Sequence, residues 1–74
     1  MDTRTLPAPG ARIKDLRLGR VLTQKELAYH LGLEAVTVSR WERGEVQPSD
    51  LNRVRLGRFF GVHPNEFLPT QAAA

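Results

Sequence analysis

Apolar and polar positions follow the period of a helix between residues 23 and 32, and this is the clearest pattern in the chain. Three apolar residues share one helical face: Leu27, Ala28 and Leu31. Thr23 and Glu26 have the spacing of a capping box, in which each side chain bonds the backbone amide of the other residue. Gly32 allows the left-handed conformation in which helices often end. The pattern predicts a helix from Thr23 to Leu31.

A second helix is predicted from about residue 34 to residue 43, with Gly44 as its stop. Val38 and Trp41 lie three residues apart and face inward, so Trp41 is interpreted as a core residue rather than a base-stacking residue. Five residues form the outward face: Ala35, Val36, Ser39, Arg40 and Arg43. Two short helices joined by a glycine turn are typical of proteins that read DNA.

Three further helical segments are predicted around this pair. One runs from about Gly10 to residue 18 or 19, with Ile13 and Leu16 inward. Another runs from about residue 50 to residue 60, capped by Ser49 and ended by Gly61. A short last helix starts near Pro64. The segment from Val62 to Leu68, which contains this helix, is expected to close the core through Val62, Phe67 and Leu68.

A chain of 74 residues has room for one small core, and a domain of this size often gains stability by dimerising. Residues 1–9 are predicted to be a flexible arm, in which Arg4 is a candidate for a minor-groove contact; the alternative is a disordered leader. Residues 10–68 form the predicted domain, and residues 69–74 a disordered tail.

The charge balance is compatible with a nucleic-acid partner. Lysine and arginine outnumber aspartate and glutamate by 11 to 8, and the calculated pI is about 10.2. Because acidic residues are interspersed, binding depends on where the arginines lie rather than on the net charge of +3.

Several other classes of protein are disfavoured. The chain has no cysteine, and it shows neither a signal peptide nor a long apolar run, so we expect a cytoplasmic location, nucleoid-associated when bound to DNA. His30 and His63 lie in separate elements without the acidic neighbours of a metal or catalytic site. We therefore expect no enzyme activity, no metal and no cofactor.

Three motifs at fixed spacing resemble the phage repressor and Cro-like helix-turn-helix family, also called the xenobiotic-response-element type. They are Thr-Gln-Lys-Glu-Leu-Ala from Thr23, the glycine at position 32, and Ser-Arg-Trp-Glu-Arg-Gly from Ser39. The resemblance covers about residues 10–68. It implies an all-α, compact five-helix lambda-repressor-like domain, with the helix-turn-helix at its second and third helices.

The resemblance also implies which residues touch DNA. Gln24 would contact the DNA backbone, and four residues would face base edges or nearby phosphates: Ala35, Val36, Ser39 and Arg40. Arg40 is the preferred base reader, because a guanidinium group can bond O6 and N7 of a guanine together. The remaining candidates for the DNA backbone are Thr23, Lys25, Thr37 and Arg43. For Lys25 and Arg43 the alternative is an ordinary solvated charge, and for Thr37 a local helix residue.

Two further roles concern the placement of the recognition helix. The resemblance implies that Arg17 pairs with Glu42 and ties the first helix to the recognition helix, a structural role. Glu34 suits the positive end of the helix dipole, although it could instead accept a hydrogen bond from a cytosine amino group. The structural interpretation of Glu34 is preferred.

The sequence departs from the family pattern in three places, one of which is Glu34 and Ala35 in place of the Ser-Arg start common on recognition helices. Val21 stands where the family usually has glycine, and Gly19 appears two residues earlier, so the first helix is expected to end early. Arg53 and Gly57 replace an apolar residue and an alanine, and Gly57 is expected to leave room for the two phenylalanines Phe59 and Phe60.

The helix over residues 50–60 also has a second apolar face containing Leu51 and Val54. We expect a homodimer interface formed by Leu51, Val54, Phe59 and Phe67. The alternative is a shifted helix register that buries Leu51 and Val54 in the core of one chain.

The expected function is that of a sequence-specific transcriptional regulator that binds double-stranded DNA. As a homodimer it would read an inverted repeat whose half-sites lie about 10 base pairs apart. The alternative is an antitoxin or other protein-binding module of the same fold, with a toxin as partner and DNA binding secondary.

Overall fold

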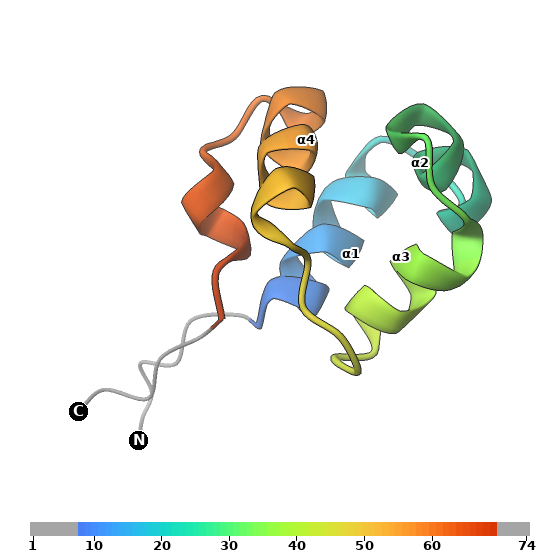
Figure 1. The fold of residues 1–74 in the computed structure, drawn as a ribbon. Helices are drawn as coiled ribbons and strands as arrows, with labels where there is room; N and C mark the ends of the chain where they lie inside the picture. Colours follow the sequence, from blue (N-terminus) through green and yellow to red (C-terminus); the bar gives the residue numbers. More distant parts are fainter. Residues whose placement is uncertain (1–7, 70–74) are drawn as a thin grey trace, which may run out of the picture.

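The computed structural model describes residues 8–69, which form four α-helices, one short 3-10 helix and no strand (Figure 1). The elements are α1 (Pro9–Gly19), α2 (Gln24–Leu31), α3 (Ala35–Glu42), α4 (Asp50–Phe60) and η1 (Pro64–Phe67). The all-α prediction is confirmed for these residues. The predicted count of five helices is wrong, because residues 64–67 form only a 3-10 helix. None of these helices is long and apolar enough to cross a membrane.

The predicted boundaries agree closely with these elements. α1 begins at Pro9, one residue before the predicted start, and Pro9 is already buried. α4 has the predicted bounds, and the Ser49 hydroxyl accepts a hydrogen bond from the Asn52 amide at 3.2 Å. The other residues of the predicted arm, among them Arg4, and the tail after Pro69 lie outside the described residues, except for Ala8.

The predicted capping box at the start of α2 is confirmed. The Glu26 amide donates to the Thr23 hydroxyl at 3.0 Å, and the Thr23 amide donates to the Glu26 carboxylate at 2.8 Å. The bond from the Thr23 amide holds the pKa of Glu26 below its ordinary value, because it favours the charged carboxylate, and the Thr23 side chain adds to this effect. The start of α2 is therefore fixed by its own sequence.

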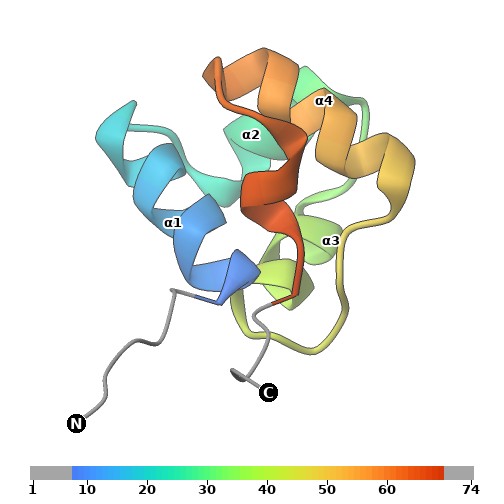
Figure 2. The same cartoon turned by 90° about the vertical axis from the view of Figure 1, so that its left-hand side faces the viewer.

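Nine apolar side chains are buried between the helices: Ile13, Leu27, Ala28, Leu31, Val38, Trp41, Leu56, Phe60 and Phe67. Figure 2 shows η1 lying between α1 and α4. Val62 packs against this core, as predicted. The prediction for Leu68 is wrong, since this side chain is 42% exposed. η1 ends at Phe67, and Leu68 continues in extended backbone that leaves its side chain outside the core.

Two glycines allow backbones to approach closely. A β-carbon at Gly10 would collide with the carbonyl oxygen of Trp41, so Gly10 lets the start of α1 pack on the end of α3. A β-carbon at Gly57 would lie 2.6 Å from the carbonyl oxygen of Val62. The expectation that Gly57 makes room for the phenylalanines is therefore wrong; it makes room for the chain that leads into η1.

The end of α1 differs from the other helix ends in its residue type. Gly32, Gly44 and Gly61 take left-handed backbone at φ of 72°, 76° and 72°, and Val21 does so at 57°. The amide after Val21 bonds the carbonyl of Arg17 at 3.1 Å, as the amide after Gly32 bonds the carbonyl of Ala28 at 2.8 Å. α1 does end at Gly19, but the left-handed turn falls on the β-branched Val21, for which this conformation is strained.

We therefore predict that Val21→Gly stabilises the protein. Left-handed backbone costs an L-residue about 1–2 kcal/mol, and glycine avoids this cost. Glycine loses more backbone entropy on folding, however, which offsets about 0.5–1 kcal/mol of the gain. The expected net gain is about 1 kcal/mol, or a rise in Tm of about 4–8 °C in thermal unfolding. The control Val21→Ala keeps the strained backbone and should gain less. A Tm for Val21→Gly at or below that of the wild type would contradict the assignment of strain to Val21.

Candidate nucleic-acid interface

A buried ion pair between Arg17 on α1 and Glu42 on α3 holds α3 against α1. The guanidinium donates two hydrogen bonds to the carboxylate, from Nε to Oε2 at 2.6 Å and from Nη2 to Oε1 at 2.9 Å. The two side chains are only 9% and 4% exposed. The bonds to Glu42 raise the pKa of Arg17 above its ordinary value. This is the pair that the family resemblance implies.

The same ion pair reaches two more parts of the helix-turn-helix. Arg17 Nη1 donates to the carbonyl oxygen of Leu22 at 2.7 Å, immediately before the cap of α2. Gln24 Nε2 donates to Glu42 Oε1 at 3.0 Å. Four segments are thus joined through one carboxylate and one guanidinium. The bond from Gln24 to Glu42 has no signal in the sequence, because it depends on the angle between α2 and α3.

The outward face of α3 contains the predicted base-reading residues. Val36 is 47% exposed and Arg40 is exposed, while Ala35 and Ser39 are half-buried. Within residues 8–69, Arg40 forms no ion pair and donates no side-chain hydrogen bond. Its guanidinium can therefore turn toward a ligand without breaking an internal contact.

Arg43 already has hydrogen-bonding partners within the protein, although its side chain is exposed. Its guanidinium lies 2.7 Å from the Glu45 carboxylate and also donates to the Ser39 hydroxyl. The bond from Arg43 lowers the pKa of Glu45, and the charge of Arg40 adds to this effect. Glu45 was not among the predicted site residues. Its position two residues after Arg43, just beyond the helix-ending Gly44, was the available signal.

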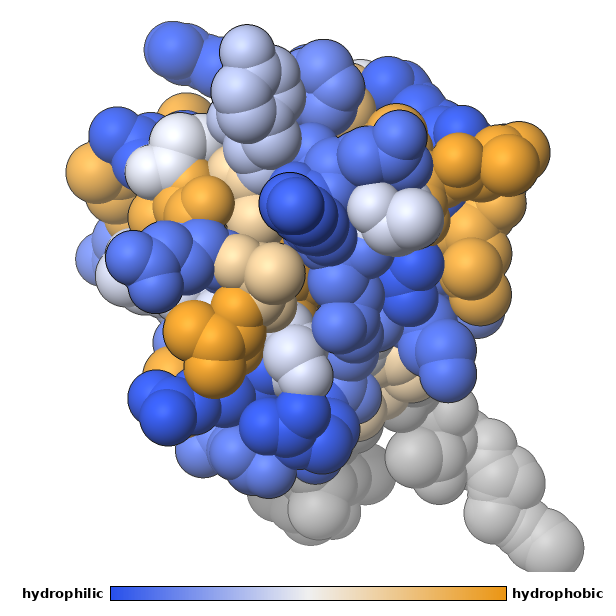
Figure 3. Space-filling model, turned by 90° about the vertical axis from the view of Figure 1, so that its right-hand side faces the viewer, coloured by the Kyte–Doolittle hydropathy of each residue, from blue (hydrophilic) through white to orange (hydrophobic). Residues whose placement is uncertain are grey.

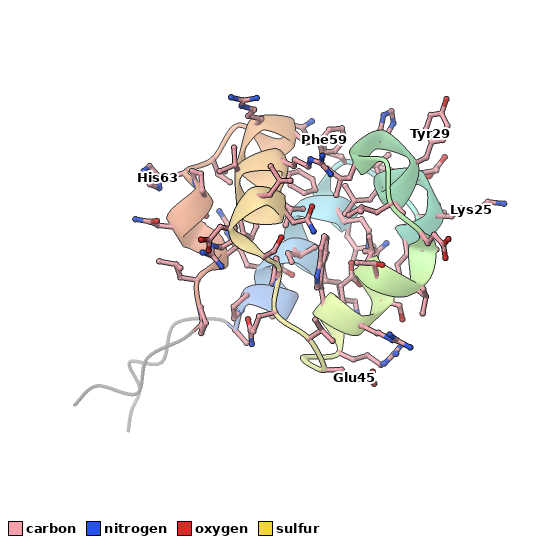
Figure 4. The ribbon with its side chains drawn as sticks, in the orientation of Figure 1. Lys25, Tyr29, Glu45, Phe59 and His63 are labelled. Atoms are coloured by element: carbon pink, nitrogen blue, oxygen red, sulfur yellow. The ribbon has the colours of Figure 1, made fainter. Side chains whose placement is uncertain are left out.

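The start of α2 lies beside α3. Figure 4 shows Lys25 projecting away from the body of the protein on the side where α2 and α3 meet. Thr23 is occupied by the capping box, so the amides of Gln24 and Lys25 remain the free donors of the first turn. Thr37 is half-buried, and its amide donates a hydrogen bond to the carbonyl of Glu34. Glu34 therefore caps α3 through its backbone, and its side chain forms no capping hydrogen bond.

The face formed by α2 and α3 is mainly hydrophilic, with some exposed apolar side chains among the polar ones (Figure 3). Such a face, with free helix-start amides beside a protruding helix, is suited to an anionic, groove-bearing ligand.

The residues predicted for a dimer interface do not lie on one surface. Leu51 and Val54 are 59% and 38% exposed, so the alternative that buries them in the core is wrong. Phe67 has no exposed surface and cannot contact a second chain, because it fills the core beneath α1 and α4. Phe59 is partly buried and packs against the core. Leu51 and Val54 alone remain as an exposed apolar pair on α4.

Known proteins share this arrangement. The family described as Helix-turn-helix matches residues 13–67. The transcriptional regulator DicA of Escherichia coli (strain K12) is 35% identical over 68 residues, which cover 92% of this chain and 50% of DicA. The chain spans half or less of the length of the curated relatives that it matches.

Two solved structures extend the comparison. The P22 c2 repressor, in complex with synthetic operator 9T, aligns with a TM-score of 0.79 and 29% identity over 84% of this chain and 94% of that one. The restriction-modification controller protein C.AhdI from Aeromonas hydrophila aligns with a TM-score of 0.71 and 32% identity, over 81% and 87% of the two chains.

We predict that Arg17→Met lowers the free energy of unfolding by about 3 kcal/mol or more, because the buried Glu42 carboxylate loses its partner. The double variant Arg17→Met, Glu42→Leu should recover much of this loss. Urea denaturation measures each change. Arg12→Met is the matched control, because Arg12 lies on the same helix as Arg17 but forms only a surface ion pair with Glu66 on η1. This variant should cost less than about 1 kcal/mol. Equal losses for Arg17→Met and Arg12→Met would show that burial adds nothing to the Arg17 pair.

Proposed function

The chain belongs to the helix-turn-helix family of phage repressors and Cro/C1-like transcriptional regulators, and on this basis we propose that it is a sequence-specific regulator that binds double-stranded DNA. The observation that carries the proposal is the outward face of α3. The Arg17–Glu42 pair holds α3 against α1, and Gln24 of α2 bonds the same carboxylate, while the outward face has an Arg40 that is unpaired among the described residues.

In the proposed complex α3 lies in the major groove, with its first residues toward the base edges. α2 crosses the adjoining DNA backbone and directs its free amides at a phosphate. The Arg17–Glu42 pair supports this geometry because it fixes the end of α3 relative to the start of α2. No catalytic residue or cofactor is needed.

The base-reading roles follow from the chemistry of each side chain. Arg40 donates two hydrogen bonds to a guanine, which is worth about 1–3 kcal/mol of discrimination. Ala35 and Val36 have no polar side-chain atoms and contact thymine methyl groups. Ser39 accepts a bond from Arg43 within the protein and retains its hydroxyl proton for a base or a water.

The contacts to the DNA backbone are more constrained. Gln24 donates one N–H of its side-chain amide to Glu42, so the second N–H of the same Nε2 donates a hydrogen bond to a phosphate oxygen. Glu42 thereby acts as a positioning residue for Gln24. Lys25 is exposed and reaches a phosphate directly, whereas Arg43 must release Glu45 to do so. Thr37 contributes through a water or its hydroxyl at the edge of α3.

We also propose that the protein acts as a homodimer on an inverted repeat with half-sites one helical turn apart. Leu51 and Val54 support this assignment, because they are exposed apolar residues one turn apart on α4. Regulation of nearby genes is the expected output.

Selection of binding sites from a random duplex pool tests DNA recognition. We expect an enriched inverted repeat, and Arg40→Ala should weaken the binding of each half-site by about 5- to 150-fold, the loss expected for one guanine contact. Arg40→Ala should also relax selection at one symmetric pair of positions. Arg12→Ala is the control, since Arg12 contacts Glu66 on η1 and should leave the selected sequence unchanged. Titrations are made at several salt concentrations. Failure to enrich any sequence would contradict the proposal.

Sedimentation of two variants tests the dimer. Val54→Glu places a charge on the exposed apolar face of α4 and should shift the protein toward monomer at a concentration where the wild type is dimeric. Leu18→Glu changes an apolar side chain of α1 that is 53% exposed, and it should leave the dimer intact. A Val54→Glu protein that remains dimeric would remove this face from the interface.

A further inference from the structure

An open groove of about 590 Å³ lies between the end of α2 and the last turns of α4. Its main lining residues are Tyr29, His30, Arg55, Arg58 and Phe59. None of the residues that line it is acidic. The groove therefore combines aromatic rings with positive charge, and none of its side chains has a role in the proposed DNA complex.

The floor of the groove is held in a fixed arrangement. The ring of His30 stacks on Phe59, with ring centres 5.2 Å apart and an angle of 28° between the planes. The guanidinium of Arg20 lies 5.2 Å from the centre of the Phe59 ring, a cation–π contact. Tyr29 is 81% exposed beside this floor. An exposed tyrosine next to a fixed aromatic floor is typical of a surface that binds another protein.

The groove is also lined by arginines that have no carboxylate partner among the described residues. Four described arginines form ion pairs with carboxylates: Arg12, Arg17, Arg43 and Arg53. The other arginines of residues 8–69 are Arg20, Arg40, Arg55 and Arg58, and none of them pairs with a carboxylate in this range. Arg40 is the candidate base reader. Of the remaining three, Arg55 and Arg58 line the groove and Arg20 lies over the Phe59 ring, so the groove is complementary to negative charge.

The position of the groove separates it from the DNA-binding face. Figure 4 shows Tyr29 and Phe59 at the end of the molecule opposite Glu45, while Lys25 marks the start of α2. α2 directs its first turn toward the proposed DNA site and its last turn toward the groove. A duplex held by α3 and the start of α2 leaves Arg55 and Arg58 available to a second partner.

We propose that this groove binds an acidic segment of another protein, with an apolar side chain of that segment seated against Phe59 and its carboxylates on Arg55 and Arg58. An open groove cannot enclose a small ligand, which normally buries most of its surface. Tyrosine and arginine contribute strongly to binding energy at protein interfaces. This proposal is independent of the DNA-binding function.

The test uses the full chain labelled with ¹⁵N and a capped synthetic peptide rich in Glu and Asp around a central Leu and Phe. Amide signals of Tyr29, Gly32 and Phe59 should shift on titration. The double variant Arg55→Glu, Arg58→Glu should weaken the peptide affinity by about 10-fold or more, since two charge contacts become repulsive. The double variant Arg12→Glu, Lys14→Glu has the same net charge and should bind the peptide like the wild type. Both variants change exposed or partly exposed side chains, and circular dichroism checks that they fold.

Four results would overturn the proposal. The first is a peptide that shifts no groove signal, and the second is equal weakening by the two double variants. The third is the same set of shifts with inorganic phosphate alone, which would make the groove a simple anion site. The fourth is a loss of affinity for the selected duplex in the Arg55→Glu, Arg58→Glu variant that exceeds the loss in the control, which would make the groove part of the DNA interface. DNA affinity is measured on the same samples, so a failure of this proposal is distinguishable from a failure of DNA recognition.

Discussion

The Arg17–Glu42 ion pair is the interaction on which the arrangement of the helix-turn-helix depends. A buried carboxylate must be paired, and Glu42 is paired by a guanidinium from α1 and an amide from α2. The same guanidinium bonds the chain just before α2. Both charged side chains are almost completely buried. If either were removed, the other would stay buried without a charged partner, which is unfavourable. The angle between α2 and α3 is therefore set by polar contacts as well as by the shared apolar core.

The arginines of this small domain divide by their partners. Among those that pair with carboxylates, the buried Arg17 joins α1 to α3 and the surface pair of Arg12 with Glu66 joins α1 to η1, whereas Arg43 and Arg53 pair with nearby residues of the chain. Those without a carboxylate partner among the described residues lie on α3 or around the Phe59 floor. The modest net charge of the whole chain conceals this division. Positive charge that is free to meet a ligand is concentrated in two places, and these places lie at different ends of α2.

Much of the fold was predictable because its signals are local. The capping box of Thr23 and Glu26, the glycine that ends α2, and the inward positions Val38 and Trp41 depend only on spacing along the chain. The features that were missed depend on tertiary geometry. Phe67 and Leu68 are adjacent apolar residues, and only the end of η1 decides that one is buried and the other exposed. Gly57 serves the chain around Val62, which is not visible from the pattern of α4 alone. The candidate site shows the same limit, since the face of α3 follows from helical spacing but the bonds of Gln24 and Arg43 do not.

The most direct measurement is an NMR titration of the ¹⁵N-labelled protein with the duplex obtained by selection, with the side-chain signals of Gln24 and Arg17 included. We expect large shifts for the first turn of α2, the Gln24 side-chain amide and the outward face of α3. The Arg17 Nε–H signal should stay in place, because its bond to Glu42 persists in the complex. Shifts confined to the groove around Phe59, or a displaced Arg17 signal with no change on α3, would contradict DNA binding by α3 and the start of α2.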